Sequence, residues 1–226
     1  MAGADAQGQS CYIDKERGPV RRFYAYVAGA RRMSAQGGRF IMTLEEQLLS
    51  FVPLNEQEER DRSLMLRFLR EGKTPFSREN ETAHFTASAW VTNPARDRVL
   101  MAWHNIYRSW AWTGGHADGD ADLLSVARRE VEEETGLRAP RPVRETPISL
   151  EIITVDGHEK RGRYVSSHLH LNVTYLFEAD DAAPLVVKPD ENSGVRWFSP
   201  EEALKACSEP WMAARVYRKL IRRMKE

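Results

Sequence analysis

Three glutamates, Glu130, Glu133 and Glu134, stand at positions i, i+3 and i+4 of one stretch. On a helix these positions share a face, where like charges repel one another at a cost of roughly 0.2–0.5 kcal/mol for each pair. No lysine follows within the next turn to neutralise them. Carboxylate oxygens suit hard divalent cations, and Mg²⁺ above all when a phosphate completes the coordination shell. The spacing therefore predicts a cation site.

A glycine loop and one helix must position these glutamates. Gly114 and Gly115 precede the helix, and Asp118 or Asp120 is expected to cap its start by accepting hydrogen bonds from the first turn. Gly136 is expected to end the helix in the left-handed conformation. An apolar stripe at helical spacing should face the core: Leu123, Leu124, Ala127 and Val131.

The stretch from Gly115 to Leu137 resembles the Nudix box, G-x5-E-x7-R-E-U-x-E-E-x-G-U, where U is a bulky aliphatic residue. Eight positions are in register: Gly115, Arg129, Glu130, Val131, Glu133, Glu134, Gly136 and Leu137. One position departs, because Ala121 stands where the family has its first glutamate. In the family that glutamate pairs with the box arginine, so the partner of Arg129 is open, with Asp120 or Asp122 as candidate substitutes.

The resemblance implies an α/β (α+β) fold, an α/β/α sandwich around a mixed sheet. It also implies a Mg²⁺-dependent hydrolase, with Mn²⁺ as an alternative ion, that acts on acid anhydrides in phosphorus-containing substrates. Such an enzyme uses water to cleave a nucleoside diphosphate linked to another moiety, as a nucleotide pyrophosphatase does. Its metal ligands would be Glu130, Glu133, Glu134 and the carbonyl of Gly115, while Arg129 orients the glutamates. The ion offsets phosphate charge and lowers the pKa of a bound water.

The general base varies among relatives of this kind. It is either a box glutamate, here Glu133 or Glu134, or an acid from a loop outside the box. Glu191 is the preferred external candidate, because such chains often carry an acidic residue shortly before the strand that ends in a tryptophan like Trp197. Asp190 competes with it, and an ordinary loop carboxylate is the other interpretation.

Histidines offer further polar contacts. His168 and His170 alternate onto one face of a predicted strand, and His116 lies in the glycine loop. We expect these three to bind substrate phosphate or to line a polar cleft. Zinc binding is the alternative, although neither a supporting cysteine nor an HxxxH spacing accompanies them. Four tryptophans are expected in the core rather than stacked on a nucleobase: Trp90, Trp103, Trp110 and Trp112.

The chain divides into three segments by pattern. Residues 1–41 show no sustained period and are expected to be a disordered extension, with a transit peptide or an early gene start as alternatives. Residues 42–78 form a helical leading module, and residues 79–226 form the Nudix-like domain with a C-terminal helix. The module is expected to pack on that domain, with substrate contact or a homodimer as alternatives.

Capping signals and alternation predict the individual elements. In the leading module, Thr43 with Glu46, and Asn55 with Glu58, are expected to form capping boxes. Strands are predicted at 84–91, 98–103, 110–112, 147–155, 168–177 and 195–198, the first two as a hairpin. The C-terminal helix has an apolar stripe of Trp211, Tyr217, Leu220, Ile221 and Met224. Its basic residues are expected to face solvent: Arg215, Arg218, Lys219, Arg222 and Arg223.

Composition limits the class of protein. Lys plus Arg equals Asp plus Glu, 33 each, so a general binder of nucleic-acid duplexes is not expected. Two distant cysteines, Cys11 and Cys207, argue against a disulfide framework and favour a cytoplasmic location. No apolar run approaches the roughly 20 residues that span a membrane. The resemblance implies a small-molecule nucleoside diphosphate derivative as the partner.

Two other functions are compatible with the resemblance. One is a ligand sensor that keeps the fold without hydrolysis, which Ala121 favours slightly and the intact box glutamates oppose. The other is an enzyme like isopentenyl-diphosphate isomerase, which shares the fold and needs a catalytic cysteine near the pocket. Neither Cys11 nor Cys207 is well placed in the sequence for that role.

Overall fold

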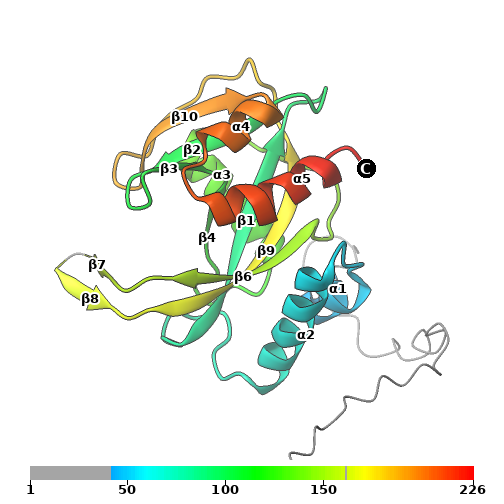
Figure 1. The fold of residues 1–226 in the computed structure, drawn as a ribbon, viewed down its shortest axis with the longest axis vertical. Helices are drawn as coiled ribbons and strands as arrows, with labels where there is room; N and C mark the ends of the chain where they lie inside the picture. Colours follow the sequence, from blue (N-terminus) through cyan, green and yellow to red (C-terminus); the bar gives the residue numbers. More distant parts are fainter. Residues whose placement is uncertain (1–41, 161) are drawn as a thin grey trace, which may run out of the picture. The chain divides into compact units, whose positions relative to one another are not determined.

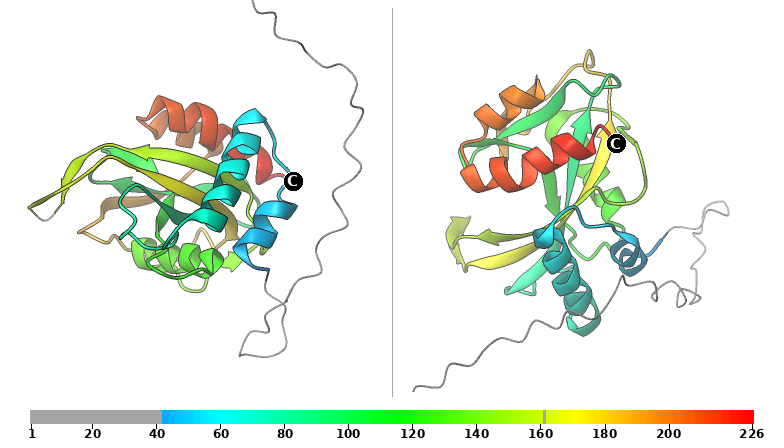
Figure 2. Two further views of the ribbon diagram at one scale, coloured as in Figure 1. Left: turned by 90° about the horizontal axis from the view of Figure 1, so that it is seen from below. Right: turned by 45° about the vertical axis from the view of Figure 1, so that its right-hand side comes forward.

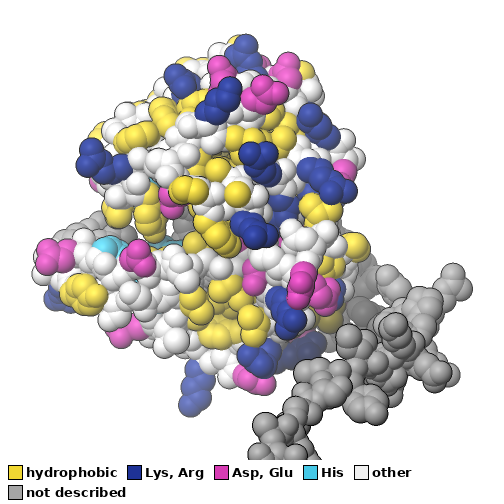
Figure 3. All heavy atoms as spheres, in the orientation of Figure 1, with side chains coloured by type: hydrophobic (Ala, Val, Ile, Leu, Met, Phe, Trp, Pro, Cys, Tyr) yellow, Lys and Arg dark blue, Asp and Glu magenta, His cyan; other side chains and the backbone are white. Residues whose placement is uncertain are grey.

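The computed structural model describes residues 42–160 and 162–226 (Figure 1). The extension expected at residues 1–41, which includes Cys11, lies outside the described residues. None of the described helices is both long and apolar enough to cross a membrane. On the face shown in Figure 3, acidic and basic side chains are interspersed rather than gathered by sign.

A mixed sheet forms the centre of the fold. Its main strand order is β10 (Asn192–Phe198), β2 (Val99–His104), β1 (Ala83–Thr92), β9 (His168–Glu178) and β5 (Arg141–Pro142). Three further strands pair alongside: β3 (Ser109–Ala111) with β2, β4 (Thr113–His116) with β1, and β6 (Ser149–Val155) with β9. Among the described strands only β1 and β9 pair in parallel, over the full length of β1.

The central strand β1 is buried on both faces, whereas its sequence predicted alternating burial. All of its residues are buried, because helices cover both faces of the sheet and neighbouring strands take both edges. The return strand β2 is confirmed, but its pairing with β1 is limited to Thr92 opposite Val99. The predicted hairpin is therefore confirmed as a short antiparallel pair, and β4 and β9 pair with the rest of β1.

Helices lie on both faces of the sheet, which confirms the predicted layers (Figure 2). On one face α3 (Leu123–Thr135) packs against β1 residues such as Phe85 and Ala87. On the other face α4 (Pro200–Ala206), the π-helical η1 (Met212–Tyr217) and α5 (Arg218–Arg223) pack around Trp90. Between β6 and β9 the chain forms a small hairpin of β7 (His158–Lys160) with β8 (Arg163–Val165).

The leading module consists of α1 (Leu44–Ser50) and α2 (Glu56–Glu71), as predicted. Thr43 forms its capping box with Glu46. Asn55 caps α2, but the carboxylate of Glu58 does not complete a second capping box and instead turns inward, where the amide of Leu54 donates to it at 2.6 Å. Apolar residues of both helices join the core on the α3 side: Leu44, Leu48, Phe51 and Met65.

Helix α3 starts later than predicted, with its cap four residues after Asp118 and two after Asp120. Its cap is Asp122, whose carboxylate accepts hydrogen bonds from the amide and hydroxyl of Ser125 at 3.1 and 2.8 Å. The chain still turns at Asp118 and Gly119, both with positive φ, so neither Asp118 nor Asp120 begins the helix. Gly136 ends α3 in the left-handed conformation with φ of 72°, as predicted.

The basic face predicted for the C-terminal helix is wrong at two positions. Lys219 and Arg223 are buried, while Arg215, Arg218 and Arg222 are exposed. The ammonium of Lys219 lies 3.0 Å from Glu58 and 2.8 Å from Glu151, and the guanidinium of Arg223 lies 2.8 Å from Glu58. Trp211, predicted in the apolar stripe, is exposed.

Candidate active site

The glycine loop contacts both β1 and α3. Gly114 pairs opposite Ser88 and Gly115 opposite Ala87. A Cβ atom at Gly115 would lie 2.5–2.7 Å from the carboxyl atoms of Glu130. Only glycine therefore lets this carboxylate approach the backbone so closely.

Burial perturbs two of the three box glutamates. Glu134 is 6% exposed, and its carboxylate accepts a 2.9 Å hydrogen bond from the amide of Gly114. Burial raises the pKa of Glu134 to about 8, although the Gly114 hydrogen bond opposes this and the charges of Glu130 and Glu191 add to it. Burial, followed by the charges of Glu133 and Glu191, raises the pKa of Glu130 to about 7. Burial and mutual repulsion therefore both disfavour the charged forms of Glu130 and Glu134.

Lys188 links the box helix to the loop before β10. Its ammonium lies 3.0 Å from the carboxylate of Glu133 and 3.1 Å from that of Glu191. Desolvation lowers the pKa of Lys188, but hydrogen bonds to Glu133 and Glu191 outweigh it and raise the pKa above its ordinary value. The structure thus brings Glu191, the predicted external acid, next to the box glutamates.

Asn192 holds the loop before β10 against the box helix. Sequence reasoning did not identify this residue. Its buried side-chain amide donates to the carbonyl of Glu134 at 2.9 Å and accepts from the amide of Lys188 at 3.2 Å. The amide of Asn105 in the β2–β3 turn donates to the carbonyl of Glu191 at 3.2 Å. Lys188 and Asn192 carry no signal in the sequence alone, because their partners belong to other elements.

The substitute partner of Arg129 is Asp120. Their side chains approach to 3.6 Å, and both are about half exposed. Asp122, the other candidate, is engaged as the cap of α3. An exposed ion pair of this length contributes about 1 kcal/mol at most. Arg129 is therefore held loosely, and its orienting role stays a prediction.

The donors at this site fit a hard divalent cation. Glu130, Glu133, Glu134 and the backbone of Gly115 offer oxygen atoms, which Mg²⁺ and Mn²⁺ prefer. Burial and the neighbouring carboxylates raise the pKa values of Glu130 and Glu134, and Lys188 opposes both shifts only in part. An added cation would supply what is missing, and the assignment of these four residues as ligands stays a prediction.

The predicted histidines come together with one more. Ligand nitrogens of His84, His116, His168 and His170 all lie within 4.8 Å of one another. His84 was missed because it belongs to β1, and only the parallel pairing with β9 places it opposite His170. The expected binding of substrate phosphate by the other three stays a prediction.

Comparison with known proteins agrees with this geometry. The sequence model of the NUDIX domain matches residues 82–224. The chain belongs to the NUDIX domain family. It is 31% identical over 100 residues to the uncharacterized Nudix hydrolase YfcD of Shigella flexneri, covering 44% of this chain and 47% of that protein. The chain thus spans about half the length of that curated relative.

Other similarities are more distant. An isopentenyl-diphosphate Delta-isomerase of Clavibacter sepedonicus is 27% identical over 138 residues, which cover 58% of this chain and 68% of that enzyme. Among solved structures, a C. elegans Ap4A hydrolase binary complex has a TM-score of 0.43 at 19% identity, covering 62% of this chain and 97% of that one. The E. coli dihydroneopterin triphosphate pyrophosphohydrolase has a TM-score of 0.46 at 14% identity, covering 61% and 94%. No argument about substrate follows from scores this low.

Proposed function

We propose that this NUDIX domain protein is a Mg²⁺-dependent hydrolase that cleaves a diphosphate bond in a small molecule. The proposed substrate is a nucleoside diphosphate linked to another moiety, and Mn²⁺ is an alternative ion. The observation that carries the proposal is the group of Glu130, Glu133 and Glu134 on one helix, with Glu130 packed against Gly115 and with burial and mutual repulsion raising the pKa values of Glu130 and Glu134. Membership of the family supports the same chemistry. A cytoplasmic location belongs to this proposal.

The chain's own groups have separable roles in the proposed reaction. Glu130, Glu133, Glu134 and the carbonyl of Gly115 would hold the cation, which offsets phosphate charge and acidifies water when bound. The hydrogen bond from Gly114 to Glu134 keeps the loop on the helix. Lys188, held between Glu133 and Glu191, is placed to contact a phosphate oxygen once those carboxylates turn to a cation.

Proton transfer needs a base near this group. Water oxygen forms a bond to phosphorus, the bridging P–O bond breaks, and the proton of the water passes to a carboxylate. Glu191 is our first candidate, because it is tied to the box through Lys188 while belonging to a separate loop. Glu133 and Glu134 are the alternatives, and Arg129 orients the box helix side chains.

Release of phosphate or nucleotide from a panel of nucleoside diphosphate derivatives tests this function. We expect release with Mg²⁺, none with chelator, and loss of release in Glu134→Gln. The control variant is Glu132→Gln, on the same helix but outside the predicted ligand set, which should keep activity. Release that persists in chelator or in Glu134→Gln would contradict the proposal.

The isomerase alternative finds no support at this site. Cys207 is the only cysteine in the described part of the chain, and it is buried after α4, with its sulfur 3.7 Å from the hydroxyl of Ser109. The sensor alternative keeps Ala121 as its one supporting observation. Ligand binding without product release across the whole panel would favour the sensor.

A further inference from the structure

Four of the six histidines of the chain gather at one point of the sheet. Three strands contribute them: β1 gives His84, β4 gives His116, and β9 gives His168 and His170. Parallel pairing sets His84 opposite His170, and the β4–β1 pairing sets His116 opposite Thr86. One ring nitrogen of each histidine lies within 4.8 Å of the others.

Backbone contacts fix the tautomers of two members. The Nδ1 atom of His168 lies 2.8 Å from the carbonyl oxygen of Ser166, and the Nδ1 atom of His84 lies 3.0 Å from that of Asn80. A carbonyl oxygen only accepts, so in both rings Nδ1 carries the proton. The Nε2 atom of each neutral ring is then a lone-pair donor. Metal-binding histidines are usually oriented in this way, by donating the other N–H to a carbonyl or carboxylate.

One of these lone pairs has no partner. The Nε2 atom of His84 is buried and has no hydrogen-bond partner among the described residues, although a buried polar atom of this kind normally has one. The Nε2 atom of His168 lies 3.1 Å from Nε2 of His170 and accepts a hydrogen bond when that nitrogen carries the proton. A metal ion bound between the rings would satisfy Nε2 of His84 and replace the contact between His168 and His170.

We propose that His84, His116, His168 and His170 form a second metal site that binds a transition-metal ion, with Zn²⁺ as the first candidate. Imidazole nitrogen suits Zn²⁺, Ni²⁺, Co²⁺ and Cu²⁺, whereas Mg²⁺ prefers the oxygen donors of the box. Four nitrogen ligands complete a tetrahedral shell, as in structural zinc sites. In such a shell neighbouring nitrogens are roughly 3.3 Å apart, so the rings draw together when the ion binds.

The site would tie the glycine loop to the sheet. His116 directly follows Gly115, whose backbone touches Glu130, and the other ligands belong to β1 and β9. A bound ion would therefore join three strands next to the box without using any box carboxylate. Its role is to position the loop, and it goes beyond the proposed hydrolysis.

Metal content and spectroscopy test the site directly. The full chain is stripped with chelator, loaded with Zn²⁺, and dialysed against buffer with excess Mg²⁺ before mass-spectrometric metal analysis. We expect about one zinc ion per chain and a Tm higher by roughly 5 °C than that of the stripped protein. Co²⁺ loading should give the intense visible absorption of a tetrahedral site.

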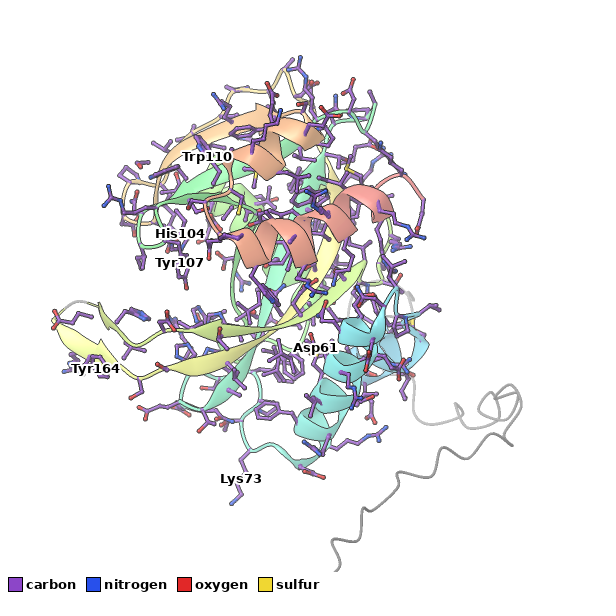
Figure 4. The ribbon with its side chains drawn as sticks, viewed as in Figure 1. Asp61, Lys73, His104, Tyr107, Trp110 and Tyr164 are labelled. Atoms are coloured by element: carbon purple, nitrogen blue, oxygen red, sulfur yellow. The ribbon has the colours of Figure 1, made fainter. Side chains whose placement is uncertain are left out.

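Matched variants locate the ion. His84→Gln and His168→Gln should each lower zinc retention by at least tenfold. His104→Gln, a histidine beside Tyr107 in the β2–β3 region and outside the group (Figure 4), should retain zinc. Glu130→Gln/Glu134→Gln should also retain it, which separates this site from the box and from any failure of hydrolysis.

Two results would overturn the proposal. One is zinc content that is near zero in the wild-type chain, or equal in the wild-type and His168→Gln chains. The other is pyrophosphate binding by the metal-free chain that is lost in His168→Gln, which would mean that the histidines contact phosphate directly. The Co²⁺ spectrum of the wild-type chain decides the case even if His84→Gln fails to fold.

Discussion

Two groups of carboxylates in this molecule are neutralised very differently. Glu58 and Glu151 are fully buried, and Lys219 and Arg223 lie within 3.0 Å of their oxygens. Hydroxyl and amide groups of Ser149, Asn172 and Thr174 satisfy the remaining lone pairs of Glu151: their polar atoms all lie within hydrogen-bonding range. Here two negative charges meet two positive ones inside the fold.

The box glutamates lack this compensation. Glu130, Glu133 and Glu134 bring three carboxylates together, and Glu191 adds a fourth nearby. Lys188 binds Glu133 and Glu191, while the pKa values of Glu130 and Glu134 stay raised. Buried charges are normally paired. The first group is therefore neutralised by lysine and arginine of the folded chain, whereas the second would be neutralised by a cation bound from solution.

Removing one box carboxylate should give the largest effect on activity. Glu134→Gln keeps the size of the side chain and an oxygen that can accept from Gly114, but removes a charge from the predicted cation site. We expect turnover with Mg²⁺ to fall on the order of 10²–10⁴-fold. The free energy of unfolding in chelator should stay the same or rise, because a repelling charge is gone. A large loss of stability would mean that the charge of Glu134 is compensated within the fold, as the charges of Glu58 and Glu151 are.

Removing one cation from the paired group should instead destabilise the fold. Lys219→Met leaves Glu58 and Glu151 buried with only Arg223 to offset them. We expect the free energy of unfolding to fall by about 3–5 kcal/mol in urea titrations. Arg222→Met is the matched control, since this neighbouring basic residue is exposed and should change stability by about 0.5 kcal/mol or less. Equal effects in the two variants would contradict the pairing argument.

The pH dependence of stability should report the unpaired group. Carboxyls whose pKa rises from 4.5 to about 7 and about 8 make the cation-free folded chain bind more protons than the unfolded chain between pH 4.5 and 8. The free energy of unfolding therefore falls as pH rises through this window. We expect this decrease in the free energy of unfolding to be smaller when Mg²⁺ is added. It should also be smaller in the double variant Glu130→Gln/Glu134→Gln. Unfolding by urea at pH 5, 6, 7 and 8 measures it, and a flat profile in chelator would argue against the raised values.

Local signals predicted local structure well. The capping box of Thr43 and the left-handed Gly136 depend on residues within one helical turn, and each is confirmed. The strands that carry the histidines, and the α/β/α layers implied by the resemblance, are also confirmed. The order and spacing of the box residues were enough to predict a cation site on this helix.

What the sequence could not give depends on contacts between distant elements. Lys219 was expected in solvent because its helix is rich in basic residues, yet the buried Glu58 and Glu151 draw it inward. Glu58 left its expected capping box for the same reason. The fourth histidine, His84, joins the others only through strand pairing. These side chains are placed by charge and register, which no single segment encodes.

Restoring the missing box residue should have the smallest effect. Ala121→Glu places an acid near Arg129, whose present contact with Asp120 is long and exposed. We expect a gain of about 0.5–1 kcal/mol in the free energy of unfolding. Turnover should change by less than about fivefold, which corresponds to roughly 1 kcal/mol in the barrier. Asp120→Ala is the complementary variant and should lose about as little. If Ala121→Glu instead raised turnover from nothing to a measurable rate, the wild-type chain would be a sensor, and its unpaired carboxylates would bind a cation without hydrolysis.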